Sequence, residues 1–254
     1  TMGRVKAISP EEQLSLVEHL DELRARIIVS IVVFGVALAL CFWQNHLLLE
    51  LANGPLPSDH DRLITFGVTE PFTTTMTVAA YGAIILALPI LLYQLFAFLL
   101  PAFSKQEQRA VLPLVLLMPA LFIAGIVFGY FVVLPAATNF LLGFNDAQFN
   151  IQLRAKEYYG FFAQTLLACG IVFQVPVVIL SLTRLGIVNV DQLKQNRRYA
   201  YLVCAVLAAA LPGVDPISML LETAPLILLY ELSIVLARVF SRPLESASPA
   251  PQPQ

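Results

Sequence analysis

Long apolar runs, separated by short polar segments, make up most of the chain. A hydrocarbon core about 30 Å thick is crossed by about twenty residues of helix, at 1.5 Å per residue. Six runs are candidates for such crossings, at residues 27–43, 72–99, 111–142, 158–182, 199–211 and 217–237. The pattern predicts an all-α, polytopic membrane protein with six transmembrane helices and both termini on one side of the bilayer.

The placement of the basic residues supports this count. If the termini lie inside, the inner segments hold twelve of the fifteen Lys and Arg residues, and the outer segments hold only Arg62, Arg154 and Lys156. Basic residues concentrate in the cytoplasmic loops of membrane proteins. Both termini are therefore predicted to be cytoplasmic.

Two features predict an irregular bundle. The fifth run has thirteen residues, which makes roughly 20 Å of helix against a core of about 30 Å. Either its ends extend into the headgroups or the protein thins the bilayer there. Prolines inside the spans are either ordinary irregularities or kinks, and together they favour a curved, cupped bundle. They are Pro89, Pro113, Pro119, Pro135, Pro176 and Pro225.

Composition narrows the possible functions. The chain is 58% hydrophobic and 13% charged, with a mean hydropathy of +0.78, whereas soluble proteins carry about 25% charged residues. A soluble enzyme is therefore excluded, and a net charge of −2 provides no basic field for nucleic acid. Three cysteines lie in apolar runs without metal-ligand spacing, so neither a metal nor another cofactor is predicted.

The chain reads as one membrane domain, residues 9–242, between a flexible leader at 1–8 and a disordered cytoplasmic tail at 243–254. Residues 9–12, with the sequence SPEE, are typical of a helix start. Apolar residues at helical spacing follow them. This pattern predicts an amphipathic helix that lies on the inner surface and runs into the first span.

Two acidic residues near the inner surface are candidates for binding a cationic partner. Glu22 lies on the amphipathic helix, and Glu107 follows the second span. Carboxylates bind guanidinium groups in bidentate geometry, so the two residues could recognise two arginines. The alternatives are a local ion pair between Glu22 and Arg26, four residues apart, and a solvated loop charge at Glu107.

Several short motifs in one order resemble the TatC subunit family of the twin-arginine protein translocase, over about residues 13 to 240. They are HLDELRAR at 19–26, EPF at 70–72, ALP at 87–89, LYQ at 92–94, FAFLLPA at 96–102, Glu107, Arg109, GYFVVLP at 129–135, FQVP at 173–176, NRRY at 196–199 and Asp215. The resemblance implies a glove-like arrangement of six helices with both termini inside.

The resemblance also implies a receptor in a prokaryotic cytoplasmic membrane, not an enzyme. Such a receptor binds the twin-arginine signal peptides of folded proteins at the cytoplasmic face. With single-span TatA/TatB-type partners, and as a homo-oligomer, it supports export driven by the proton-motive force. Glu22 and Glu107 match the family acids that contact the paired arginines, and Arg24 and Phe98 match residues that support them.

Further matches concern assembly and the intramembrane positions. Pro55 and Asp215 match positions important for assembly or activity, and Gln174 stands where many members carry glutamate. A neutral Gln174 avoids most of the cost of a charge in the bilayer, about 2.5–3.5 kcal/mol on insertion scales. Met219 stands where some members present a polar residue to partner helices. Glu222, one turn deeper, is not expected from the family. Either it helps to dock a partner helix, or it is a protonated acid with hydrogen bonds inside the protein.

Two other classes of protein compete with the receptor. A small-solute secondary transporter or channel would fit the composition, but it needs polar groups around a midplane site or paired repeats. Gln174, Glu222 and Glu231 are few for such a site, and no internal repeat is found. An intramembrane enzyme is not supported, because the sequence has no GxSxG or HExxH motif.

Overall fold

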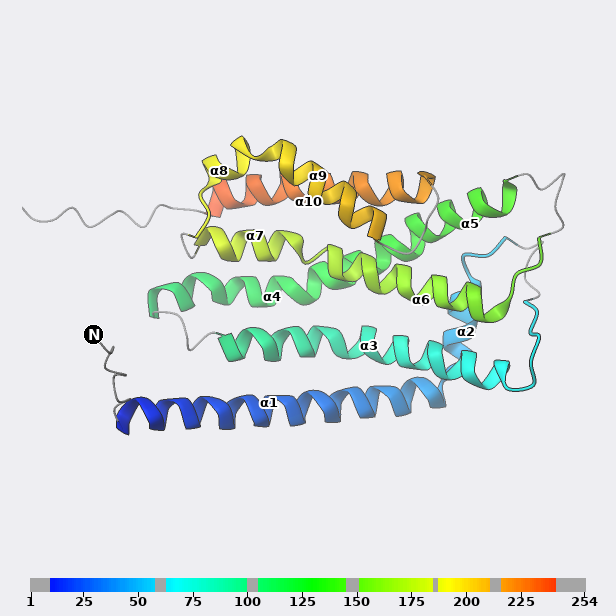
Figure 1. The fold of residues 1–254 in the computed structure, drawn as a ribbon, viewed down its shortest axis with the longest axis horizontal. Helices are drawn as coiled ribbons and strands as arrows, with labels where there is room; N and C mark the ends of the chain where they lie inside the picture. The colour runs from blue at the N-terminus through cyan, green and yellow to red at the C-terminus, as the bar shows by residue number, and fades with distance from the viewer. Residues whose placement is uncertain are drawn as a thin grey trace, which may run out of the picture.

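The computed structural model describes residues 10–57, 63–99, 105–144, 151–184, 187–210 and 216–240. In these ranges the regular elements are all helices, and the longer ones run side by side along one axis (Figure 1). They are α1 (Pro10–Trp43), α2 (Asn45–Asn53), α3 (Glu70–Leu99), α4 (Lys105–Phe128), η3 (Gly129–Val133), α5 (Leu134–Gly143), α6 (Ala155–Val172), α7 (Val175–Arg184), α8 (Val190–Gln195), α9 (Arg197–Ala210) and α10 (Pro216–Phe240). The predicted all-α membrane fold is confirmed.

Four helical segments in the described ranges are long and apolar enough to cross a bilayer, and they match the first four predicted spans. They are His19–Trp43, Glu70–Phe98, Leu117–Gly143 and Ala155–Thr183. The helices α9 and α10 lie where the fifth and sixth spans are predicted, and the 14 residues of α9 make it short. The count of six spans and the side of the termini stay predictions.

One end of the bundle is called here the N-terminal end, because α1 begins there. The helices α3, α7 and α10 end at the same place, and α4 begins there (Figure 1). The other end is called the distal end. The predicted leader at 1–8, the tail at 243–254 and residues 211–215 lie outside the described residues.

The first helix confirms that the amphipathic segment runs into the first span. The two form a single helix, Pro10–Trp43, which lies along α3 (Figure 1). That the segment lies on the inner surface stays a prediction. The sequence contains no proline after Pro10 that could end the helix before Trp43. In addition, the Arg26 side chain bonds to α3 and ties this segment to the bundle.

The third and fourth spans are each broken where a proline follows. A π-helical turn, Gly129–Val133, separates α4 from α5 just before Pro135. A turn at Phe173 and Gln174 separates α6 from α7 just before Pro176. Proline has no N–H to bond the carbonyl four residues earlier, so the helix widens or turns at that place. These breaks agree with the predicted irregular bundle.

Small residues let neighbouring helices approach closely, as is common in membranes. Ala37 and Cys41 of α1 pack on Ala79, Ala83 and Ala87 of α3, and all five are buried. Between α4 and α6, a methyl group added at Gly125 would lie 2.7 Å from the carbonyl oxygen of Cys169. These contacts fix the spacing of α1 with α3 and of α4 with α6.

Candidate functional site

The predicted residue Glu22 lies on α1 at the N-terminal end, in a hydrogen-bonded network with α3. Both Nε and Nη2 of Arg26 donate to Glu22 Oε1, at 3.0 and 2.5 Å. Nη1 of Arg26 donates to Gln94 Oε1 at 2.9 Å, and Nη2 also donates to the Ala97 carbonyl at 3.2 Å. The local ion pair considered from the sequence is therefore present, and it is also bonded to α3.

An aromatic pair lies beside this network. The ring of Phe98 on α3 stacks on His19 of α1, with centroids 4.3 Å apart and an interplanar angle of 14°. Nδ1 of His19 is 3.9 Å from Glu22 Oε2, and about a third of the Glu22 side chain is exposed. Glu22 and Phe98 are thus brought together, while Arg24 projects from the same helix as an exposed side chain.

The second predicted acid, Glu107, belongs to the first turn of α4 at the same end of the bundle (Figure 1). Its side chain lies outside the described part of the structure. The backbone positions of Glu22 on α1 and of Glu107 on α4 therefore lie at one end of the bundle.

The intramembrane position Gln174 is buried at the turn between α6 and α7. Its Nε2 donates to the Met118 carbonyl of α4 at 3.2 Å, and within the described residues its Oε1 has no hydrogen-bond partner. A neutral amide therefore bridges α4 and the break in the fourth span.

The acid at Glu222 is turned into the bundle. Only 4% of this residue is exposed, and together with Cys169 and Phe173 it lines a cavity of about 10 Å³. Met219, one turn away on α10, is partly buried and packs on the cluster of Cys204, Ala208 and Leu226. Glu222 thus faces α6, and Met219 contacts α9.

At the distal end, Pro55 is buried and its carbonyl accepts a hydrogen bond from the Thr138 hydroxyl at 3.2 Å. This bond ties the segment after α2 to α5. Asp215, the other position predicted to matter for assembly, lies outside the described residues.

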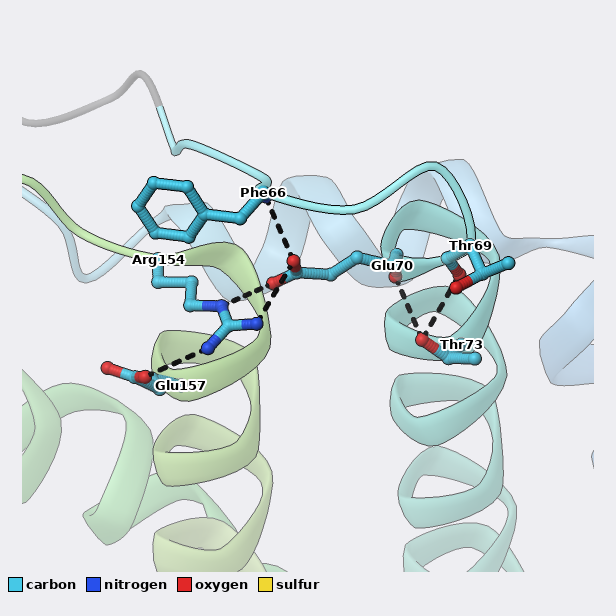
Figure 2. A network of polar contacts seen from close by, with 6 residues as sticks. All are labelled: Phe66, Thr69, Glu70, Thr73, Arg154 and Glu157. Carbon is cyan, nitrogen blue, oxygen red and sulfur yellow. Dashed lines mark hydrogen bonds and ion pairs between the residues drawn. The ribbon is translucent and has the colours of Figure 1, made fainter.

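A second polar network, which the sequence reasoning missed, closes the distal end (Figure 2). Arg154 donates from Nε to Glu70 Oε1 at 2.7 Å and from Nη2 to Oε2 at 3.2 Å. The Phe66 amide donates to Glu70 Oε2 at 3.0 Å, and the Arg154 guanidinium lies 5.4 Å from the centre of the Phe66 ring. Its bonds to the buried Glu70 raise the pKa of Arg154 above its usual range.

This network, called here the distal clamp, joins the start of α3 to the segment before α6. A short backbone pairing supports it, because the Ile64 amide donates to Leu153 and the Ala155 amide donates to Ile64, both at 2.9 Å. The sequence offered two signals for the clamp. Glu70 stands in the EPF motif, and Arg154 is one of only three basic residues predicted to lie outside.

Glu231 forms a further network near the N-terminal end. Its Oε2 accepts from Arg197 Nη2 at 2.8 Å, and its Oε1 accepts from the Tyr201 hydroxyl at 2.5 Å. The adjacent Tyr230 hydroxyl donates to the Leu193 carbonyl at 2.8 Å. These bonds fasten α8 and α9 to α10, so Glu231 serves the fold there.

Fold and polar networks together define a polytopic helical membrane protein whose ion pairs gather toward the two ends of the bundle. The sequence profile described as "Sec-independent protein translocase protein (TatC)" matches residues 18–225. The chain therefore belongs to the TatC family, a non-enzymatic component of a protein translocase. This assignment replaces the small-solute transporter or channel considered from the sequence.

Individual TatC proteins are also similar to this chain over most of its length. The TatC protein of Desulforapulum autotrophicum is 36% identical over 93% of this chain and 88% of its own length. The TatC protein of Deinococcus radiodurans is 38% identical over 93% of this chain and 91% of its own length. The chloroplastic TATC protein of Pisum sativum is 35% identical over 89% of this chain and 64% of its own length. A crystal structure named as the twin arginine translocase receptor TatC is 34% identical and superposes with a TM-score of 0.75, over 88% of this chain and 100% of that one.

Proposed function

We propose that this chain is the receptor subunit of a twin-arginine translocase and binds signal peptides through Glu22 and Glu107. The observation that carries the proposal is the position of Glu22. Its carboxylate is partly exposed at the N-terminal end of the bundle, beside the stacked rings of His19 and Phe98. The likeness to a solved protein named as a twin arginine translocase receptor supports the same function.

The chemistry of the site explains a preference for arginine. A guanidinium presents a planar fork of N–H groups that matches both oxygens of a carboxylate, whereas a lysine ammonium acts as a point charge. Glu22 and Glu107 would each take one of two adjacent arginines. Phe98 and His19 offer a flat surface for the peptide next to Glu22, and Arg24 adds its support from the same helix.

The proposed site requires the N-terminal end to face the cytoplasm, and the positive-inside bias favours this orientation. Arg24 and Arg26 belong to α1 at this end, and Arg238 belongs to the last turn of α10. We therefore assign the chain to a prokaryotic cytoplasmic membrane, with both termini in the cytoplasm.

Assembly is proposed to use the second half of the chain. Single-span TatA/TatB-type subunits would dock along α9 and α10, where Met219 is partly exposed and Glu222 lies behind it. Gln174 would offer a neutral polar contact in the bilayer. Pro55 and Asp215 would support assembly or activity, the chain would act as a homo-oligomer, and the proton-motive force would drive transport.

An export assay tests the receptor function. The chain is expressed with matching partner subunits in a cell that lacks its own TatC, and a folded reporter is placed behind an Arg-Arg leader. Export is expected to fall about tenfold or more with a Lys-Lys leader, and by a similar factor in the Glu22→Ala/Glu107→Ala variant. Glu50→Ala, which removes an exposed carboxylate from α2, serves as the matched control. Export that is indifferent to the leader and to the paired substitution would overturn the proposal.

A further inference from the structure

The two carboxylate oxygens of Glu22 differ in the contacts that they make. Oε1 accepts both N–H bonds from Arg26, whereas among the described residues Oε2 has only the ion-pair contact with His19 Nδ1 at 3.9 Å. A guanidinium that binds a carboxylate in bidentate fashion uses both oxygens. As long as Arg26 holds Oε1, an incoming arginine can reach Glu22 with only part of its fork.

Arg26 is the same chemical group as the proposed ligand. Its guanidinium already neutralises Glu22 from four residues along the helix, and a quarter of its side chain is exposed. An internal guanidinium and an external one therefore compete for one carboxylate.

We propose that Arg26 is a displaceable internal counterion, which occupies Glu22 until an arginine of the signal peptide takes its place. The inference rests on the receptor function proposed above and adds a regulatory contact to that site. In the exchange, the Glu22 carboxylate turns from Arg26 to the peptide guanidinium, and no covalent bond changes.

The surroundings of Arg26 keep the free-energy cost of the exchange low. After losing Glu22, the guanidinium keeps two other acceptors on α3, the Gln94 side chain at 2.9 Å and the Ala97 carbonyl at 3.2 Å. An arginine left without partners in a partly buried place would be strongly disfavoured. Gln94 and Ala97 hold it near α3, so α1 and α3 stay connected while Glu22 is released.

The exchange also increases the preference of the site for an arginine peptide over a lysine peptide. A peptide arginine replaces the bonds of Arg26 with equivalent bonds, whereas a lysine offers a single ammonium in place of a fork. Arg26 therefore excludes lysine more effectively than it excludes arginine. Removing Arg26 should strengthen the binding of both peptides, and that of the lysine peptide more.

The test measures peptide binding to the purified full-length chain in lipid nanodiscs. Two fluorescent peptides are used, one with Arg-Arg ahead of an apolar segment and one with Lys-Lys in its place. Arg26→Gln is expected to tighten the Arg-Arg peptide about threefold to tenfold and to reduce the Arg-Arg over Lys-Lys ratio. Arg238→Gln, which removes an exposed charge from the last turn of α10, should change neither value.

A second substitution tests the release step. Gln94→Leu removes one acceptor that receives Arg26, so the Arg-Arg peptide should bind several-fold more weakly than it binds to the unchanged chain. In an Arg26→Gln background the same substitution should have no effect, because Gln94 acts only through Arg26. This dependence would not arise if Gln94 merely supported the fold.

The outcomes separate this inference from the receptor function. If the unchanged chain does not prefer Arg-Arg, or if Glu22→Gln leaves binding unaltered, the receptor function fails and the exchange fails with it. If that preference holds but Arg26→Gln binds the peptide with equal or lower affinity at unchanged melting temperature, only the exchange is refuted. Should Arg26→Gln not fold, Arg26→Lys, which keeps the charge but loses the fork, must still bind the Arg-Arg peptide more tightly than the unchanged chain does.

Discussion

The close approach of α4 and α6 predicts opposite effects for one substitution at two glycines. A Cβ atom at Gly125 would lie 2.7 Å from the Cys169 carbonyl oxygen and 2.9 Å from Cβ of Phe173. Both neighbours are fixed, since one is backbone and the other is the first atom of a side chain. A Cβ at Gly35 on α1 meets nothing within 4 Å. The same added methyl group is therefore a clash in one place and free in the other.

The magnitudes follow from packing and helix propensity. Overpacking a close-packed contact costs about 1–3 kcal/mol, whereas alanine is favoured over glycine inside a helix by about 0.5–1 kcal/mol. Gly125→Ala should therefore lower the free energy of unfolding by up to about 2.5 kcal/mol, and Gly35→Ala, which has no clash, should raise it by about 0.5–1 kcal/mol. At about 2–4 °C per kcal/mol, the melting temperature should fall by up to about 10 °C in the first variant and rise by a few degrees in the second.

Thermal unfolding of the purified variants in one detergent, scanned at one rate, measures both shifts. Because Gly125 contacts Phe173, next to Gln174, Gly125→Ala should also reduce export in the reporter assay. A melting temperature for Gly125→Ala equal to or above that of the unchanged chain would refute the argument that α4 and α6 meet through this glycine. A fall for Gly35→Ala would refute the claim of free space on α1.

Two further predictions concern buried acids. Glu70→Gln removes the negative charge of the distal clamp, so the melting temperature should fall by a few degrees. In the double variant Glu70→Gln/Arg154→Gln, the melting temperature should fall by less than the sum of the falls in the two single variants, because paired residues are coupled. Equal, additive losses would contradict the clamp. Glu222→Leu should reduce crosslinking of a partner's transmembrane helix to α10 and lower export, whereas Leu228→Val on the exposed face of α10 should not. Unchanged assembly in Glu222→Leu would show that this acid plays no part in docking.

Hydropathy and local spacing were sufficient for the parts of the fold that depend on neighbours in the chain. The first predicted span ends at Trp43, as α1 does, and the second, 72–99, differs from α3 by two residues at its start. The Glu22–Arg26 pair was also predictable, because residues four apart share a face of a helix. Each of these features is set within a few turns of one helix.

The features that depend on distant parts of the chain were not predictable. Gln94 and Ala97, which bind Arg26, lie about seventy residues further along the chain. Arg154 lies 84 residues from Glu70. Prolines indicated that the third and fourth spans would be irregular, but the form of each break depends on the helices packed beside it. Hydrophobic periodicity carries no information about such pairings.

The two halves of the bundle differ in a way that bears on the proposed site. In the first half, α1 and α3 are continuous through the membrane segment and are joined by buried small residues, so Glu22, Arg26 and Phe98 are held on rigid elements. In the second half, α4 and α6 are each interrupted, and the buried amide of Gln174 spans the interruption. Recognition of a guanidinium fork needs geometry held to within about 0.5 Å, which continuous, closely packed helices provide. The placement of Glu22, Arg26 and Phe98 on α1 and α3 therefore suits the proposed recognition of one guanidinium, whereas Glu107, in the first turn of α4, would bind the second.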